Sequence, residues 1–159
     1  MSRRKITIER TYQATLQDVW DLWTTKAGIE SWWGPEGFTT RVIELDLRPG
    51  GRMRYEMTAT GPDQVAFMKQ AGMPLSVEGR ITYSEIVPLK RLAYTHLADF
   101  IPGVEPYDIA TAVELHAEGR NVRMVLTLDA MHSDEWTERA VMGWESQLGK
   151  LSGVLTRAD

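Results

Sequence analysis

The sequence predicts an α+β fold in which a curved antiparallel sheet wraps around one long C-terminal helix. Two patterns support this prediction. Between Ser133 and Leu155 the apolar residues recur in steps of three or four, so they lie on one face of a helix. Most of the preceding segments alternate apolar and polar residues, which is typical of strands with one buried face. Because each such face needs a cover, we expect the sheet to pack against the helix.

The N-terminal part predicts one strand followed by two short helices. Residues Ile6 to Tyr12 alternate in strand period. Thr15 and Asp18 match a capping box, in which the threonine hydroxyl accepts a hydrogen bond from a free backbone amide at the start of a helix. Thr25 is placed to cap a second helix over Lys26 to Trp33, which the following Gly-Pro pair would end.

Six strand-like segments follow, and most are separated by short turns. They run from Phe38 to Leu47, around Met53 to Met57, and over Ser76 to Val87, Lys90 to Leu97, Ile109 to Ala117 and Asn121 to Leu128. Short turns between consecutive strands favour an antiparallel meander. The glycine pair Gly50-Gly51 lies between two strands and lacks the helix N-terminus of a phosphate loop, so we do not interpret it as a phosphate site.

Residues Thr60 to Leu75 interrupt the strand alternation. Pro62 and Gly72 are placed to begin and to end about two turns of helix. Two interpretations of this segment stay open. It is either a surface segment that docks through its apolar residues, or a lid over a cavity.

The long C-terminal helix is predicted over Ser133 to Leu155. Its apolar face consists of Trp136, Ala140, Trp144, Leu148, Leu151 and Leu155. Ser133 is a good N-cap, and two acidic residues follow it where the helix dipole favours negative charge. Three glycines lower the intrinsic helix propensity, so packing of the apolar face must stabilise this helix.

Length and composition favour one domain over residues 1–159 and exclude several classes of function. The formal net charge is −4 without a basic block, so we expect neither a nucleic-acid partner nor a membrane partner. There are no cysteines, which excludes disulfides and thiolate chemistry. No apolar run approaches the roughly 18 residues of a membrane span. The N-terminus lacks the apolar core of a signal peptide, so we expect a cytoplasmic protein.

Several short motifs place the sequence near a known family. They are VWDLW at residues 19–23, WWGP at 32–35, DLRPGG at 46–51, EIVP at 85–88 with the following Arg91-Leu92, and Gly143-Trp144 with Leu148 and Leu151. Together they resemble the activator of Hsp90 ATPase homologue 1-like family of the START/Bet v 1-like (SRPBCC) superfamily. The resemblance covers nearly the whole chain and implies the helix-grip fold. It implies no single function, because such proteins include hydrophobic-ligand binders, cyclase-like enzymes and co-chaperone domains.

The sequence shows no clear catalytic or metal-binding set. His96, His116 and His132 lack the spacing of metal ligands, so we expect no metal site and no cofactor. His96 shares a strand face with Tyr94 and could orient a polar ligand group or act as a base, although a core or rim histidine is the plainer interpretation. Ser133 is explained by its capping role, without a nucleophilic one.

We therefore expect a hydrophobic cavity between the long helix and the sheet, with a small apolar or aromatic molecule as its ligand. The expected ligand-binding residues are Tyr55, Met57, Tyr94, His96, Trp136, Ala140, Trp144 and Leu148. Trp32 and Trp33 cannot both face inward from one helix, so one of them is expected to edge the cavity mouth. Two alternatives remain open: a cyclase- or hydratase-like enzyme acting on a polyketide-like or aromatic substrate, or a module that interacts with a chaperone.

Overall fold

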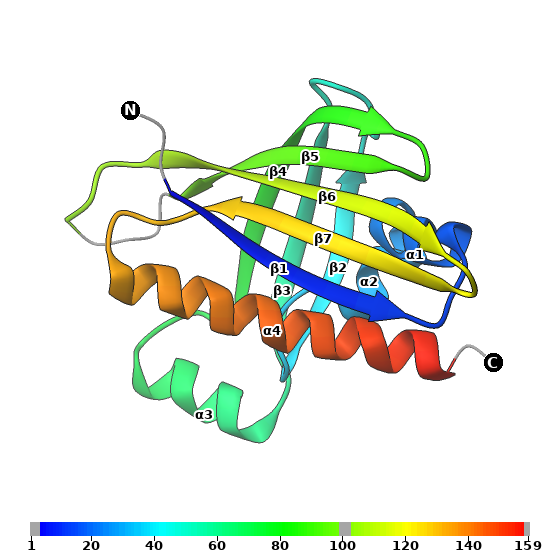
Figure 1. Cartoon of the computed structure of the whole chain (residues 1–159). Coiled ribbons are helices and arrows are strands. Elements are labelled where there is room, and N and C mark those ends of the chain that lie inside the picture. Colours follow the sequence, from blue (N-terminus) through cyan, green and yellow to red (C-terminus); the bar gives the residue numbers. More distant parts are fainter. Residues whose placement is uncertain (1–3, 99–102, 158–159) are drawn as a thin grey trace.

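The computed structural model describes residues 4–98 and 103–157. Its elements follow in the order β1 (Lys5–Tyr12), α1 (Leu16–Thr24), α2 (Lys26–Trp32), β2 (Phe38–Leu45), β3 (Arg52–Ala59), α3 (Pro62–Gln70), β4 (Ser76–Val87), β5 (Arg91–Ala98), β6 (Tyr107–Glu118), β7 (Asn121–Asp129) and α4 (Asp134–Arg157). Within this described part, the seven strands form a single antiparallel sheet in the order β1-β7-β6-β5-β4-β3-β2. The sheet arches over α4, which runs along its concave side (Figure 1).

Two register shifts accompany the curvature of the sheet. One lies between Val42 and Glu44 in β2, and the other between Tyr83 and Glu85 in β4. An extra residue on one strand bends that strand and increases its twist. Helices α1 and α2 carry the chain from β1 at one edge of the sheet to β2 at the opposite edge. The predicted helix-grip fold is confirmed.

The two short helices begin as the sequence predicts. The Thr15 hydroxyl accepts a hydrogen bond from the Asp18 amide at 3.0 Å, and the Asp18 carboxylate accepts one from the Thr15 amide at 3.3 Å. The Thr25 hydroxyl caps α2 through the Gly28 amide at 3.0 Å. Reciprocal bonds of this kind satisfy amides that the first helical turn leaves free.

Trp32 and Trp33 are both buried, with 0% and 6% of their surface exposed. They do not share one helix face, as the helical spacing requires, because α2 ends between them. Trp32 is the last residue of α2, and Trp33 has already left the helix with φ −66° and ψ 138°. Because its backbone is extended, the side chain of Trp33 is not bound to the helical spacing and also turns inward.

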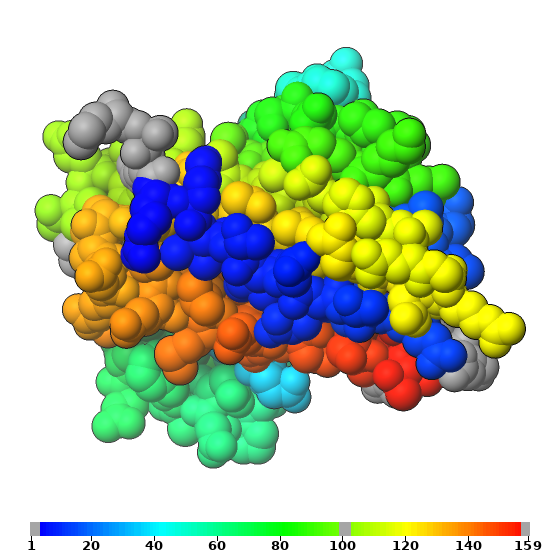
Figure 2. All heavy atoms as spheres, viewed as in Figure 1, coloured from blue at the N-terminus to red at the C-terminus, as the bar shows by residue number. Residues whose placement is uncertain are grey.

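Residues Thr60 to Leu75 contain α3, with Pro62 in its first turn and Gly72 in a left-handed conformation just past its end (φ 70°). Its buried anchor is Met68, whereas Phe67 is 65% exposed. The helix projects as a separate lobe beyond α4 (Figure 2). A segment held by few buried side chains opens more easily than the sheet around it.

The long helix α4 is buried unevenly along its length. The Ser133 hydroxyl accepts a hydrogen bond from the Trp136 amide at 3.2 Å, as expected for an N-cap. Leu148 and Leu151 in its second half are 2% and 0% exposed. Trp144 in its first half is only half-buried, so the space between α4 and the sheet is incompletely filled there.

Candidate functional site

A pocket of about 300 Å³ lies between the first half of α4 and the sheet. Its floor is formed by side chains from five adjacent strands, namely Tyr55, Met57, Ile81, Tyr94, His96, Ile109, Leu128 and Asp129. Its roof on α4 consists of Trp136, Arg139, Ala140, Gly143, Trp144 and Gln147, and its sides of Trp33, Pro35 and Met131. The lining is mostly apolar, with a few polar groups at fixed places, which is the composition of small-molecule sites.

The structure brings seven of the eight sequence-predicted residues together around this pocket, namely Tyr55, Met57, Tyr94, His96, Trp136, Ala140 and Trp144. Leu148 is placed elsewhere. It belongs to the closed core, where it is 2% exposed and lies in the same buried cluster as Ile29 and Trp32 of α2.

Sequence reasoning missed several lining residues. Ile109 and Leu128 follow the strand alternation and could have been found from it. The sequence marks Gly143 as a weak helix former and as part of a family motif, and neither feature indicates a pocket; a side-chain carbon added there would meet no atom outside its own stretch of helix within 4 Å. Together with Ala140, one turn earlier, it gives the roof a region of small residues. This region leaves the pocket open beneath the helix.

Aromatic rings form one wall of the pocket. The Trp33 ring lies edge-on to Tyr55 at a centroid distance of 5.8 Å and to Trp144 at 5.9 Å. Trp144 also stacks on the buried Trp23 at 6.0 Å with an angle of 24° between the planes. These distances and tilts are favourable for ring pairs. The rings of the wall are therefore held by contacts with one another, and Trp33, Tyr55 and Trp144 border the pocket.

Gly79 allows Tyr55 to take its place in this wall. The two residues are paired across β3 and β4. A side-chain carbon at position 79 would lie 2.4 Å from the Tyr55 ring and 2.5 Å from its hydroxyl. The absence of a side chain lets the tyrosine ring lie across the neighbouring strand.

Two buried hydroxyls face each other across β5 and β6, and of the two residues that carry them only Tyr94 lines the pocket. They belong to Tyr94 on β5 and Thr111 on β6, each of which is 2% exposed. Burial raises the pKa of Tyr94 well above its ordinary value, and the nearby Tyr55 adds to this. Side-chain hydrogen bonding with the Thr111 hydroxyl opposes these effects and lowers the pKa of Tyr94.

The ionisable groups of the pocket differ in charge and in how many partners within the protein they have. Burial lowers the pKa of His96 below its ordinary 6.5, with Asp108 opposing this, so the imidazole is neutral at pH 7. The Asp129 carboxylate accepts a hydrogen bond from the Ala110 amide at 3.0 Å and is ion-paired with Lys5. Asp129 is therefore already engaged by the sheet.

Arg139 is the lining residue of α4 that carries a positive charge. Its guanidinium lies over the Trp136 ring at 4.8 Å from the centroid and pairs with Glu135 at 2.9 Å. A cation over a tryptophan face is attracted by the ring quadrupole. The charge of Arg139 is thus held in the first half of α4, over a ring that also lines the pocket.

The loop that carries Trp33 and Pro35 is fixed to α4 by three polar side chains. The Gln147 carbonyl oxygen accepts from the Gly34 amide at 2.8 Å, and the Ser146 hydroxyl from the Glu36 amide at 2.9 Å. Lys150 Nζ donates to the carbonyls of Gly34 and Phe38, both at 3.1 Å. These bonds give the side of the pocket a defined position relative to its roof.

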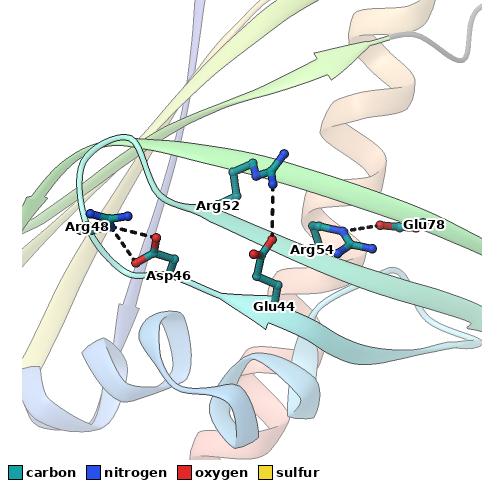
Figure 3. Close-up of polar contacts among 6 residues, drawn as sticks. All are labelled: Glu44, Asp46, Arg48, Arg52, Arg54 and Glu78. Atoms are coloured by element: carbon teal, nitrogen blue, oxygen red, sulfur yellow. Dashed lines mark hydrogen bonds and ion pairs between the residues drawn. The ribbon is translucent and has the colours of Figure 1, made fainter.

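The strands β2, β3 and β4 and the turn between β2 and β3 carry a second group of charged residues, which Figure 3 shows. Arg54 Nε donates to Glu78 at 2.7 Å, Arg48 Nε pairs with Asp46 at 2.9 Å, and Arg52 lies 3.9 Å from Glu44. Each of these cations has an acidic partner, and the pairs are solvent-exposed. Such pairs contribute little to stability individually. Because their charges compensate one another, they offer no unbalanced charge to a ligand, and we place the functional site in the pocket.

In the described ranges, no group of three or more acidic or histidine side chains is gathered closely enough to hold a metal ion. The helices of the same ranges include none that is both long enough and apolar enough to cross a membrane.

Comparison with protein families gives one match, to the family described as activator of Hsp90 ATPase homolog 1-like protein, over residues 13–156. The chain belongs to this family. The match extends from the end of β1 to the last turn of α4 and so includes every element that lines the pocket. A search of curated proteins gives no match.

Solved structures of similar proteins show the same fold. A protein from Chromobacterium violaceum superposes with a TM-score of 0.77 at 24% identity, covering 95% of this chain and 96% of its own. One from Arthrobacter aurescens gives 0.75 at 22% identity, with coverages of 96% and 86%. A Silicibacter pomeroyi protein described as AHSA1 gives 0.75 at 18% identity, with 98% and 100%. At these identities the likeness concerns the fold of the family and leaves the ligand to be argued from the pocket.

Proposed function

We propose that this protein binds a small, flat, largely apolar molecule in the pocket between α4 and the sheet and does not transform it. The observation that supports this most is the wall of Trp33, Tyr55 and Trp144, whose rings border a space of about 300 Å³. That volume is at the small end of the range for ligand sites. It suits a molecule of two or three fused rings that stacks on aromatic side chains.

Binding without turnover is the simpler interpretation of the polar groups. Catalysis needs a base in reach of a reacting proton and an acid or oxyanion donor opposite it. His96 is neutral and could serve as a base. Asp129, the carboxylate in the floor, is engaged by Lys5 and a backbone amide. The pocket thus offers at most one free base and mostly apolar contact surface.

The test is a titration of tryptophan fluorescence with flat aromatic compounds, beginning with naphthalene and 2-naphthol. We expect saturable quenching with a Kd of about 10 µM for the better compound. Ala140→Phe places a ring in the roof of the pocket and should weaken binding at least tenfold. Met142→Phe is the matched control, because Met142 lies on the same helix but is 70% exposed on its outer side.

Equal quenching of the wild type and Ala140→Phe would show that the pocket is not the binding site. An enzyme of the cyclase or hydratase class is the second candidate, because the neutral His96 lies two residues from Tyr94 on one strand face. In that case a quenching compound would be consumed over time, and His96→Ala would stop its consumption.

A further inference from the structure

We propose that Gln147 anchors the ligand by donating a hydrogen bond to a neutral carbonyl oxygen at its edge. The inference rests on the proposed function and makes the ligand class narrower, a flat apolar molecule that carries one such acceptor. Three features of the molecule support it: the fixed orientation of the Gln147 amide, its place beside the aromatic wall, and the partners of the other polar groups in the lining.

The hydrogen bond with Gly34 fixes the orientation of the Gln147 amide. The Gly34 N–H can only donate, so the side-chain atom 2.8 Å from it is the carbonyl oxygen Oε1. The Nε2 atom then lies on the other side of the amide carbon and carries two N–H donors. In the described part of the chain no hydrogen bond uses this Nε2 atom, and it is not among the unpartnered polar atoms that are closed off from solvent. A donor group of set orientation thus remains open.

Gln147 lines the pocket from α4, next to the aromatic wall. Trp144 precedes it by three residues, and side chains three apart in a helix are neighbours on one face. The Trp144 ring lies edge-on to Trp33 at 5.9 Å, and Gln147 is bonded to Gly34, the residue that follows Trp33. A flat ligand that stacks on this wall therefore has its edge beside the Gln147 amide.

The hydroxyls and the imidazole of the lining do not offer a comparable donor. Side-chain hydrogen bonding with Trp33 lowers the pKa of Tyr55 against the larger effect of burial, so the Tyr55 hydroxyl already has a partner. The Tyr94 hydroxyl is closed off from solvent. His96 is neutral at pH 7, and each of its ring nitrogens is a donor or an acceptor according to the tautomer. Gln147, by contrast, presents donors alone on its open side.

The charges of the lining favour a neutral acceptor over a carboxylate. Asp129 brings a negative charge to the floor and is ion-paired with Lys5. Arg139 pairs with Glu135 at 2.9 Å. An anionic ligand would give up its hydration and find no free counter-charge in the described lining, whereas a carbonyl oxygen loses less hydration. The lining therefore suits a ketone, an amide or a similar carbonyl group.

The experiment measures two probes of one shape, 2-acetylnaphthalene and 2-isopropenylnaphthalene, by calorimetric titration. They differ in a carbonyl oxygen that a methylene group replaces. Because they also differ in hydration, the readout is the ratio of their affinities, ketone to alkene, compared between proteins. Gln147→Glu keeps an acceptor for the Gly34 amide and removes the N–H donors, so we expect this ratio to fall about fivefold, the value of one net hydrogen bond. Gln147→Met removes the donors without adding a charge and should lower the ratio as much.

Lys150→Met is the matched control. Lys150 bonds the same loop through the Gly34 carbonyl at 3.1 Å but does not line the pocket. Loosening of the loop changes both affinities together, so the ratio should stay at its wild-type value. In the wild type, the ketone should also bind more tightly than 2-naphthoate.

An unchanged ratio in both Gln147 variants would overturn the inference and leave the proposed function standing. An equal fall of the ratio in Lys150→Met would do the same, because Gln147 would then act through the loop alone. Tighter binding of 2-naphthoate than of the ketone would also overturn it. If no probe binds the wild type, the inference and the proposed function both fail.

Discussion

Replacing Trp144 by alanine tests whether the space beneath α4 is open. In a closed core, removal of a large aromatic side chain destabilises a protein by about 3–5 kcal/mol, part of which is the cost of the cavity left behind. Trp144 borders a pocket that already exists, so the new space joins that pocket and the cavity part of the cost is small. The rest of the cost comes from two sources. The variant loses the ring pairs that Trp144 forms with Trp23 and Trp33, worth about 0.5–1.5 kcal/mol each, and it loses the apolar surface that Trp144 buries. We expect a total of about 2–3 kcal/mol.

Trp32→Ala is the comparison variant. Trp32 is 0% exposed, and its indole nitrogen donates to the Leu22 carbonyl at 2.7 Å. Its removal leaves both a closed cavity and an unpaired carbonyl, so we expect a loss of about 4–5 kcal/mol. Equilibrium urea unfolding followed by circular dichroism measures both values without using tryptophan fluorescence. A loss for Trp144→Ala equal to or above that of Trp32→Ala would refute the reasoning, because it would mean that no open space adjoins Trp144.

Three further predictions concern the floor, the ionisable groups and the loop. Gly79→Ala should destabilise the fold by about 1–3 kcal/mol, as overpacking does, and a smaller loss in a Tyr55→Leu background would show that the Tyr55 ring is the clashing group. The pKa of His96 is lowered in the folded state, so the unfolded chain binds a proton more readily as the pH falls below about 6.5. The free energy of unfolding of the wild type, measured in urea, should therefore fall between pH 7.5 and 5.5 more steeply than that of His96→Gln. Identical pH slopes for the two proteins would contradict this. Lys150→Met should cost about 1 kcal/mol and speed amide exchange in residues 34–38, whereas unchanged exchange there would mean that the Lys150 hydrogen bonds do not hold the loop.

Local signals in the sequence predict most of the fold. The capping box at Thr15 and the cap at Thr25 depend on residues three positions apart, so both helix starts could be placed correctly. Strand alternation identifies four of the pocket-lining residues, and the helical spacing of α4 identifies three more, which is why seven of the eight predicted site residues surround the pocket. Leu148 obeys the same helical spacing but lies where α2 closes the core, and no local pattern reports that packing.

The features of the site that the sequence does not predict depend on helix ends, on strand register and on contacts between distant segments. The inward turn of Trp33 depends on where α2 ends, and helix ends are poorly defined by propensity. Gln147 and Lys150 hold the loop at Gly34 from more than a hundred residues away in the chain. The facing of Tyr94 and Thr111 depends on the strand register, which a single bulge can shift.

Methionine methyl NMR tests the central claim, the binding of a flat ligand beneath α4, most directly. Met57 and Met131 line the pocket, whereas Met124 lies in the closed core and Met142 is 70% exposed on α4. An aromatic ligand shifts nearby methyl signals through its ring current. On addition of 2-naphthol, the account predicts saturable shifts of the Met57 and Met131 methyl signals, with those of Met124 and Met142 unchanged. Shifts confined to Met142, or no saturable shift at Met57 and Met131, would contradict it.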